Sequence, residues 1–229
     1  MTTANPDAAK NFSKETLLDH GDRYRRAREF YDVVTGLWDS WDEDAFSRDT
    51  VSGVFTNPEK MHVLNHEGEF FKVRGPVNIA RPVQGWPVVV QAGSSDPGRQ
   101  LAAETAEAVF TAQTNIQAAR AFYGDVKGRM AGLGRDPEHL KIMPGCMLFV
   151  ADSLEAAKFK RSQLDMLVHP ESAIGSLSST FGFDVTKLDL DRPLPDCLPE
   201  TNGAKGSRDR AIALAQDEKL TVRELAQRW

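Results

Sequence analysis

A long amphipathic helix is the first element that the pattern of apolar and polar residues predicts. Between positions 14 and 41, apolar residues recur at steps of three and four, which is the period of one helix face. These residues are Tyr24, Ala27, Tyr31, Val34, Trp38 and Trp41, and the stripe is widened by Phe30, Val33 and Leu37. The acidic stretch 39–44 lacks this period, so we expect the helix to end there.

The next segment, 45–87, has no regular apolar period, and we interpret it as an insertion. Turn-forming pairs interrupt it at Ser52–Gly53, Asn57–Pro58 and Glu67–Gly68. A short strand or hairpin arm is predicted at Phe70–Val73. Irregular excursions of this length are often functional in compact domains.

Strand and helix patterns then alternate three times between 88 and 168. The expected elements are, in order, a strand at 88–92, a helix from 96, a strand at 108–112, a helix at 115–132, a strand at 141–150 and a helix at 154–168. Ser153 is predicted to cap the last of these helices. The run Val88–Ala92 is apolar enough to predict a strand that is buried on both faces. Repeated strand–helix units favour right-handed crossovers and a parallel sheet.

The C-terminal part of the chain breaks this alternation. Residues 170–206 are rich in Ser, Pro, Gly and Asp, and we interpret them as a partly helical insertion that ends in a proline-rich loop. Two helices, at 207–217 and 221–228, close the segment that runs to residue 229. Thr221 followed three residues later by Glu224 predicts a capping box for the second helix. The whole chain is expected to form a single α/β domain.

The composition limits the functional classes. The chain has 229 residues, of which 41% are hydrophobic and 27% are charged, as in ordinary folded globular proteins. The net charge of −5 argues against a dedicated nucleic-acid binder, because such proteins are usually basic. No apolar run approaches the roughly 18 residues of a membrane span, and the N-terminus lacks the segments of a secretory signal. With two cysteines, we expect a protein of the reducing cytoplasm.

The turn between the first strand of the alternation and its helix is the best candidate for a binding site. The sequence of this turn is Gly93-Ser94-Ser95-Asp96-Pro97-Gly98. Ser95 or Asp96 would cap the helix, whose free N–H groups and dipole favour an anion, most often a phosphate. The alternative is a tight turn that begins the helix and binds nothing. Tyr24 also has two interpretations, because its phenol could donate to a phosphate or pack in the core.

Metal ligands and catalytic residues give no comparable pattern. His62 and His66 are four residues apart, but residues 65–68 are turn-like, so the two imidazoles are not expected to share a helix face. The sequence contains no nucleophile elbow, Walker motif or paired-carboxylate pattern. We therefore predict no metal site and name no catalytic residue.

An ordered series of short motifs resembles one known family. The motifs are Asn11-Phe12, Arg23-Tyr24-Arg25-Arg26-Ala27-Arg28-Glu29-Phe30, Gly36-Leu37-Trp38-Asp39-Ser40-Trp41, Gly53-Val54-Phe55, His66-Glu67-Gly68, Phe71-Lys72-Val73-Arg74-Gly75-Pro76, Gln84-Gly85, Gln91-Ala92-Gly93-Ser94-Ser95 and Val109-Phe110-Thr111. Together they resemble the nitrilotriacetate monooxygenase component A group of the bacterial-luciferase-like, flavin-dependent monooxygenases. EDTA, dibenzothiophene-sulfone and long-chain alkane monooxygenases are relatives of that group. The resemblance covers nearly the whole chain and is strongest over residues 1–150.

The resemblance implies a cofactor and its partners. Members of the family use O2 and reduced FMN, which a separate NAD(P)H:flavin reductase supplies, to oxygenate a small organic substrate. The turn at 93–96 would then hold the FMN phosphate, and Tyr24 would add a donor to it. Thr2 and Thr3 match a pair of small polar residues that the family places after its fourth strand, near the flavin.

The family fold is a (β/α)8 barrel with insertions, and this chain matches part of it. Three core strands are predicted, whereas a complete barrel has eight and takes about 250 residues. We therefore expect a partial TIM barrel, roughly strands five to seven with insertion loops, truncated at both ends. The chain would be either a fragment of such a monooxygenase or a non-catalytic piece that needs a partner chain to complete the barrel. Exposed strand edges also favour a homo-oligomer or a complex with that partner.

Overall fold

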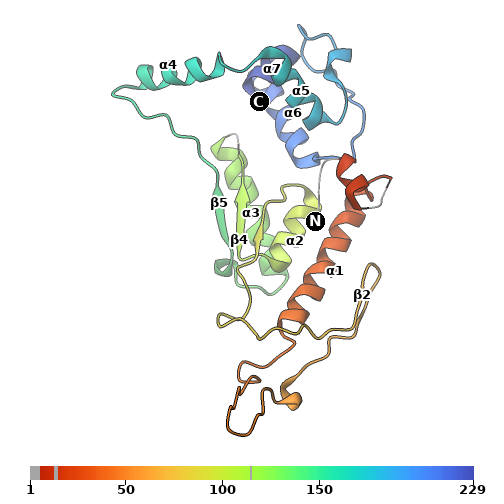
Figure 1. The fold of residues 1–229 in the computed structure, drawn as a ribbon. Coiled ribbons are helices and arrows are strands. Elements are labelled where there is room, and N and C mark those ends of the chain that lie inside the picture. The colour runs from red at the N-terminus through yellow and green to blue at the C-terminus, as the bar shows by residue number, and fades with distance from the viewer. Residues whose placement is uncertain (1–5, 13–14, 114) are drawn as a thin grey trace.

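The structure is a computed structural model that describes residues 6–12, 15–113 and 115–229. A three-stranded sheet carries two helices on one side, and a cluster of helices from the C-terminal part of the chain lies at one end of the molecule (Figure 1). Short 3-10 turns lie at Pro6–Phe12, Pro58–Lys60, Pro137–His139 and Val185–Lys187. No helix in these three ranges is long and apolar enough to cross a membrane.

Helix α1 spans His20–Trp38 and packs against helix α2 of the sheet layer. It is shorter than the helix predicted over 14–41. Before the helix, side-chain hydrogen bonds hold the Leu18 carbonyl, one of them from Asn202 at 3.1 Å, so the backbone there is not part of the helical ladder. At the other end the helix stops at the first acidic residue, Asp39, as predicted.

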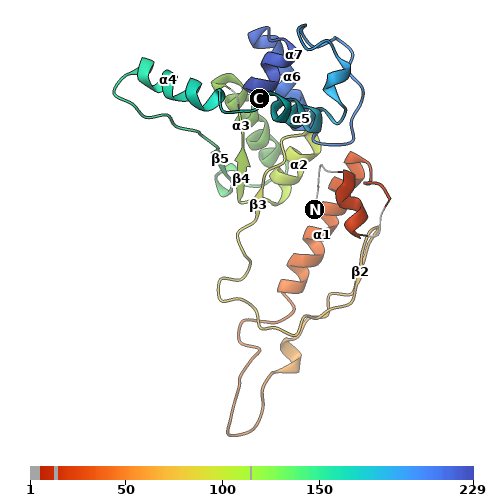
Figure 2. The ribbon, with the colours of Figure 1, turned by 45° about the horizontal axis from the view of Figure 1, so that its top comes forward.

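The segment between α1 and the sheet is irregular, as predicted, and holds one small hairpin. Strands β1 (His66–Glu67) and β2 (Lys72–Val73) pair antiparallel, and the hairpin runs along α1 (Figure 2). The carboxylate of Glu29 on α1 accepts hydrogen bonds from the backbone N–H groups of Phe70 and Phe71, at 2.9 and 2.8 Å. These bonds fasten the hairpin to the helix.

The central sheet has the predicted alternation and the predicted parallel direction. Its elements in chain order are β3 (Val90–Gln91), α2 (Asp96–Thr105), β4 (Ala108–Thr111), α3 (Ile116–Gly132), β5 (Lys141–Pro144) and α4 (Leu154–Asp165). The strands lie in the order β3, β4, β5, and the register places Val109 beside Gln91 on one side and Ile142 on the other. This is an open sheet: the described residues do not form a closed barrel.

Helices α2 and α3 cover one face of the sheet. Ser95, one of the two cap residues that the sequence offered, occupies the N-cap position of α2, but its side chain makes no cap hydrogen bond. Pro97 lies in the first turn, where its missing N–H costs nothing. The buried core between the helices and the sheet consists of Ala102, Ala103, Ala106, Val109, Phe122, Val126, Met130 and Leu140.

The other face of the sheet is open, and the prediction that the first strand is buried on both faces is wrong. Val88 is 63% exposed and Val90 is 58% exposed. Side chains alternate between the faces of a strand, and the register puts Phe110 and Met143 on the same face as Val90, where they are also exposed. The run is apolar throughout, yet the described chain supplies helices to only one of its two faces.

Strand β5 is shorter than the predicted strand at 141–150. It ends at Pro144, which pairs with Thr111, the last residue of β4. The N–H of Gly145 still donates to the Thr111 carbonyl at 2.9 Å, and beyond this point β4 offers no further partner. The chain then runs to α4, which projects away from the sheet (Figure 1). The side chain of Ser153 accepts a hydrogen bond from the N–H of Ala156 at 3.1 Å, which confirms it as the cap of α4.

A helical cluster forms the C-terminal part of the structure. Its helices are α5 (Pro170–Phe181), α6 (Lys205–Glu218) and α7 (Val222–Arg228). Their buried core consists of Ala173, Leu177, Phe181, Val185, Ala211, Leu214, Ala215, Val222, Leu225 and Ala226. Both predicted terminal helices are confirmed within two residues, and the capping box of Thr221 and Glu224 is present.

Candidate functional site

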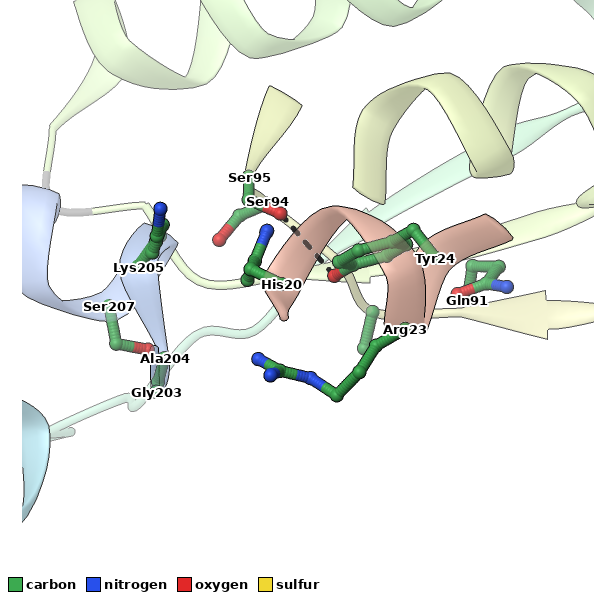
Figure 3. A pocket seen from close by; sticks show the side chains of 13 residues that line it. His20, Arg23, Tyr24, Gln91, Ser94, Ser95, Gly203, Ala204, Lys205 and Ser207 are labelled. Atoms are coloured by element: carbon green, nitrogen blue, oxygen red, sulfur yellow. Dashed lines mark hydrogen bonds between the residues drawn. The ribbon is translucent and has the colours of Figure 1, made fainter. Parts of the chain in front are cut away.

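A cavity of about 260 Å³ lies where α1, the turn after β3 and the start of α6 meet. We call it cavity A. Its walls come from the first turn of α1 with His20 and Tyr24, from residues 91–95 and from residues 203–207 (Figure 3). The cavity therefore brings together segments that are far apart along the chain.

Three helices begin at this cavity, and none of them has a side-chain cap. Asp19, Ser95 and Ala204 occupy the cap positions of α1, α2 and α6, and none of these side chains makes a cap hydrogen bond. The first N–H groups of a helix have no acceptor within the helix, and together with the helix dipole they attract anions. Three such helix ends around one cavity create an environment for a negatively charged group.

Glycines allow the three segments to approach one another. A Cβ on Gly93 would lie 2.9 Å from the Cα of Gly98, and a Cβ on Gly98 would lie 2.9 Å from the phenolic oxygen of Tyr24. On α6, a Cβ on Gly206 would lie 3.0 Å from the backbone nitrogen of Ser95. Any larger residue at these positions would push the walls of cavity A apart.

Hydroxyl groups of the cavity are arranged so that they can still donate. Arg210 donates to the Oγ of Ser94 at 2.7 Å and to the Oγ of Ser207 at 3.1 Å, which leaves each serine its own proton. Ser95 donates to the phenolic oxygen of Tyr24 at 3.3 Å, which leaves the phenol its proton. Each of these three protons can be offered to an anion in the cavity.

Arg23 joins α1 to the segment that begins α6. Its guanidinium donates to the Leu18 carbonyl at 2.6 Å and to the side-chain and backbone oxygens of Asn202 at 2.9 and 2.6 Å. The residue is 6% exposed, and its Nε is buried without a hydrogen-bond partner in the described chain. Burial lowers the pKa of this guanidinium, and Tyr24 and Asp19 act in the opposite direction. Arg23 thus fixes one wall of cavity A.

The charge around cavity A is positive. Burial lowers the pKa of the His20 imidazole, and the nearby charges of Arg23 and Lys205 lower it further. Burial also lowers the pKa of Arg210, which Asp209 counteracts. Among the residues that the structure describes, Arg23, Lys205 and Arg210 form no ion pair with a carboxylate. Arg23 and Arg210 already donate to protein oxygens, so Lys205 is the cation whose charge is available to a ligand in the described lining.

The structure brings together four of the residues proposed from the sequence. Gly93, Ser94, Ser95 and Tyr24 all line cavity A. Their role in binding a ligand remains a prediction, but their positions are those that a shared site requires.

A fifth proposed residue, Asp96, does not line this cavity. Asp96 is the first residue of α2, and its side chain, 72% exposed, accepts a hydrogen bond from Arg129 at 2.5 Å. This hydrogen bond and the charge of Arg129 lower the pKa of the Asp96 carboxyl. Thr2 and Thr3 lie outside the residues that the structure describes.

Sequence reasoning missed the cationic residues of the site. Lys205 and Arg210 belong to α6, whose amphipathic pattern gives no sign that its first turn borders the turn after β3. The one local signal is the run of small residues around Gly203 and Gly206 just before the helix, which resembles the glycine-rich starts of anion-binding helices. His20, in the first turn of α1, is a further lining residue that the sequence did not identify.

The two histidines of the irregular segment do not meet. His62 lies 2.8 Å from Asp42, and His66 lies 3.0 Å from Glu29, which is the residue that fastens the hairpin. No group of three or more potential metal ligands gathers in the part of the chain that is described.

Comparison with known proteins points to one family. The model of the luciferase-like monooxygenase family matches residues 3–183. Nitrilotriacetate monooxygenase component A of Aminobacter aminovorans is 49% identical to this chain, over 100% of the chain and 51% of the relative. N-acetyl-S-(2-succino)cysteine monooxygenase of Bacillus subtilis is 46% identical, over 98% of the chain and 52% of the relative.

A solved structure shares the fold. The crystal structure of a riboflavin lyase with modified FMN and riboflavin superposes with a TM-score of 0.83 at 28% identity, and the match covers 100% of this chain and 49% of that one. The chain spans about half the length of the curated relatives it matches. The family model nevertheless covers most of the chain, and the parallel sheet matches part of a TIM-barrel fold. The chain belongs to the luciferase-like monooxygenase family.

Proposed function

We propose that this chain binds reduced FMN and takes part in a flavin-dependent monooxygenase reaction, in which O2 oxygenates a small organic substrate. Cavity A carries the proposal, because uncapped helix ends, free hydroxyl protons and unpaired cations surround one space. The family and the names of the relatives support the same activity. The reaction belongs to the two-component type, in which a separate NAD(P)H:flavin reductase of the cytoplasm supplies the reduced FMN.

The phosphate of FMN matches the donor set of cavity A. Ser94, Ser207 and Tyr24 offer hydroxyl protons, and Lys205 offers a positive charge. The first N–H groups of α2 add donors, so the contribution of Asp96 is a backbone contribution, with its carboxylate held by Arg129. Thr2 and Thr3 remain proposed contacts of the flavin.

The flavin supplies the chemistry of the proposed reaction, and the residues of the chain bind and orient the flavin. When bound, reduced FMN supplies the electrons for the transfer of one oxygen atom from O2 to the substrate. The residues of cavity A bind the phosphate and so fix the position of the flavin relative to the sheet. Arg23 keeps the start of α6 beside α1, so that the donors converge.

A flavin titration tests the proposal. The purified chain is titrated with oxidised FMN and with riboflavin, which lacks the phosphate, and flavin fluorescence reports binding. We expect FMN to bind with a Kd of about 100 μM or lower, which is about −5.5 kcal/mol, and riboflavin to bind at least about tenfold more weakly. Equal affinity for the two flavins would remove the phosphate site from the proposal.

A pair of variants assigns the site to its residues. The double substitution Ser94→Ala/Ser95→Ala removes two hydroxyls of cavity A, and we expect the Kd for FMN to rise at least about tenfold. The matched control, Ser172→Ala/Ser176→Ala, removes two exposed hydroxyls of α5 and should leave the Kd unchanged. A double variant that binds FMN as the wild type does contradicts the assignment.

The open face of the sheet favours a second candidate function. In a closed barrel the face with Val90, Phe110 and Met143 would be the interior, filled by side chains of further strands. The chain would then be a non-catalytic binding half that becomes active when a partner chain, or a second copy of this chain, packs on that face. Sedimentation of the wild type and of Phe110→Asp tests this candidate: we expect the wild type to self-associate and the variant to do so less. A monomeric wild type would exclude the second copy.

A further inference from the structure

The carboxylate of Asp96 lies beside cavity A without lining it. Asp96 is the first residue of α2, and it lines a neighbouring cavity that shares His20, Ser95 and Lys205 with cavity A. An acidic side chain in the first turn of a helix is attracted to the N–H groups and the positive end of the dipole there. A phosphate in cavity A needs the same groups, so Asp96 is a potential competitor of the ligand.

The first turn of α2 has few N–H groups to share. Pro97 has none, and the N–H of Arg99 already donates to the Ser95 carbonyl at 2.8 Å. The N–H groups of Asp96 and Gly98 are left as the donors of this turn. If a carboxylate of the chain took one of them, the helix would lose much of what it can offer an anion.

Arg129 holds the Asp96 carboxylate where α2 packs against α3. From α3, its guanidinium donates to the Oδ1 of Asp96 at 2.5 Å and to the Oε1 of Gln100 at 3.3 Å. Its Nε donates to both carboxylate oxygens of Asp125, one turn earlier on α3, at 3.1 Å. Asp125 also pairs with Arg99 of α2 at 3.1 Å. Arg129 is therefore fixed at several points, and it fixes the Asp96 carboxylate in turn.

The ion pair also neutralises this carboxylate. The hydrogen bond from Arg129 and the charge of Arg129 lower the pKa of the Asp96 carboxyl, so the group is ionised at neutral pH. Without Arg129, the carboxylate could turn to the N–H groups of α2 or to the ammonium of Lys205, which lines the same neighbouring cavity. Both are groups that the proposed site offers to a phosphate, and the unpaired carboxylate would repel the phosphate as well.

We propose that Arg129 is a positioning residue for the ligand of cavity A, because it withdraws the Asp96 carboxylate and so keeps the start of α2 open to an anion. The inference rests on the proposed function, that is, on the FMN phosphate lying in cavity A. Arg129 does not line cavity A, so it acts through Asp96. Its role is to remove a competitor, and the loss of Arg129 should therefore be repaired by removing the competing carboxylate.

The experiment measures the Kd values for FMN and riboflavin by flavin fluorescence in four proteins. These are the wild type, Arg129→Met, Arg129→Met/Asp96→Asn and the control Arg129→Met/Asp217→Asn. Asp217 is exposed on α6 and lines neither cavity, so the control regains the wild-type net charge without a change at Asp96. We expect Arg129→Met to raise the Kd for FMN about tenfold and to leave that for riboflavin unchanged. Adding Asp96→Asn should restore the Kd for FMN to within about twofold, and adding Asp217→Asn should not.

A second substitution covers the case in which Arg129→Met does not fold, which urea titration reports. Arg129→Lys then takes its place in all three variants. A lysine keeps a charge beside Asp125, but it lacks the planar fork that reaches Asp96 at the same time. We expect the same pattern, with a smaller rise in the Kd for FMN.

The outcomes separate the two levels of the proposal. If FMN binds the wild type no more tightly than riboflavin does, the phosphate site fails, and the role of Arg129 fails with it. If FMN binds more tightly than riboflavin but the Arg129 variant keeps the wild-type ratio, only the role of Arg129 is wrong. That role is also overturned if Asp96→Asn restores nothing, since Arg129 would then act by supporting the fold. Equal repair by Asp96→Asn and Asp217→Asn would overturn it too, because net charge would explain both.

Discussion

Helices α4 and α5 are consecutive and have twelve residues each, but they lie in opposite surroundings. Helix α5 buries Ala173, Leu177 and Phe181 against its neighbours, whereas α4 buries none of its residues. Figure 1 shows α4 projecting from the molecule and α5 within the helical cluster. Two consecutive segments of equal length are therefore both helical, yet only one of them joins a core.

The spacing of apolar residues accounts for part of this difference. The buried residues of α5 recur every four positions, so they share one stripe. The large apolar residues Leu154, Phe159 and Leu164 of α4 are five positions apart, which turns each by about 140° from the one before. Helix α4 is instead attached by polar contacts, such as the hydrogen bond from the Lys160 ammonium to the Val150 carbonyl at 2.7 Å.

The sheet repeats the same contrast within a single strand. In β4, Val109 is fully buried under α2 and α3, whereas the next residue, Phe110, is 50% exposed. Two methionines mark the two sides, because Met130 of α3 is fully buried on the covered face and Met143 of β5 is 48% exposed on the open one. The fold thus consists of complete cores beside apolar surfaces that nothing in the described chain covers.

The largest expected effect comes from a matched pair of phenylalanines. Phe181→Ala in α5 removes a fully buried ring, and we expect the free energy of unfolding to fall by about 3–5 kcal/mol. Phe159→Ala in α4 removes a ring that is 62% exposed, so the change should stay within about 0.5 kcal/mol. Urea titration followed by circular dichroism measures both. Similar losses for the two variants would mean that α4 is packed in solution.

A smaller effect is expected from the two methionines, which test the faces of the sheet. Met130→Ala leaves a cavity between α3 and the sheet, and we expect a loss of about 2–5 kcal/mol in the free energy of unfolding. For Met143→Ala we expect less than about 1 kcal/mol, because the open face has no packed layer to disrupt. If Met143→Ala costs as much as Met130→Ala in the same urea titration, a second copy covers the open face.

Local patterns predicted the elements but not their surroundings. The alternation over 88–168, the cap at Ser153 and the capping box of α7 all depend on residues close together in sequence, and all are confirmed. The burial of Val88 and Val90 depends on whether another layer exists, and a run of valines carries no information about that. The predicted extent of β5 was wrong for a related reason: its partner strand β4 ends at Thr111, opposite Pro144, although apolar residues continue beyond Pro144 in the sequence.

The candidate site shows the same limit. The turn with Ser94 and Ser95 was identified because a strand, small polar residues and a helix start follow one another in the sequence. Arg210 donates to Ser94 across 116 positions, and Arg23 reaches Asn202 across 179. No local sequence pattern contains such distant pairs, so only the structure revealed the cationic residues around cavity A.

The smallest expected effect comes from two helix caps, and it tests whether α4 is coupled to the rest of the fold. Thr221 caps α7, which is part of the helical core, so Thr221→Ala should lower the free energy of unfolding by about 1 kcal/mol. Ser153 caps α4 with a similar hydrogen bond, but α4 contributes no buried residue. Ser153→Ala should therefore leave the urea midpoint unchanged and speed amide hydrogen exchange within α4 alone. If Ser153→Ala shifts the urea midpoint as much as Thr221→Ala does, α4 unfolds together with the two cores. Helices α4 and α5 would then differ in exposure but not in stability.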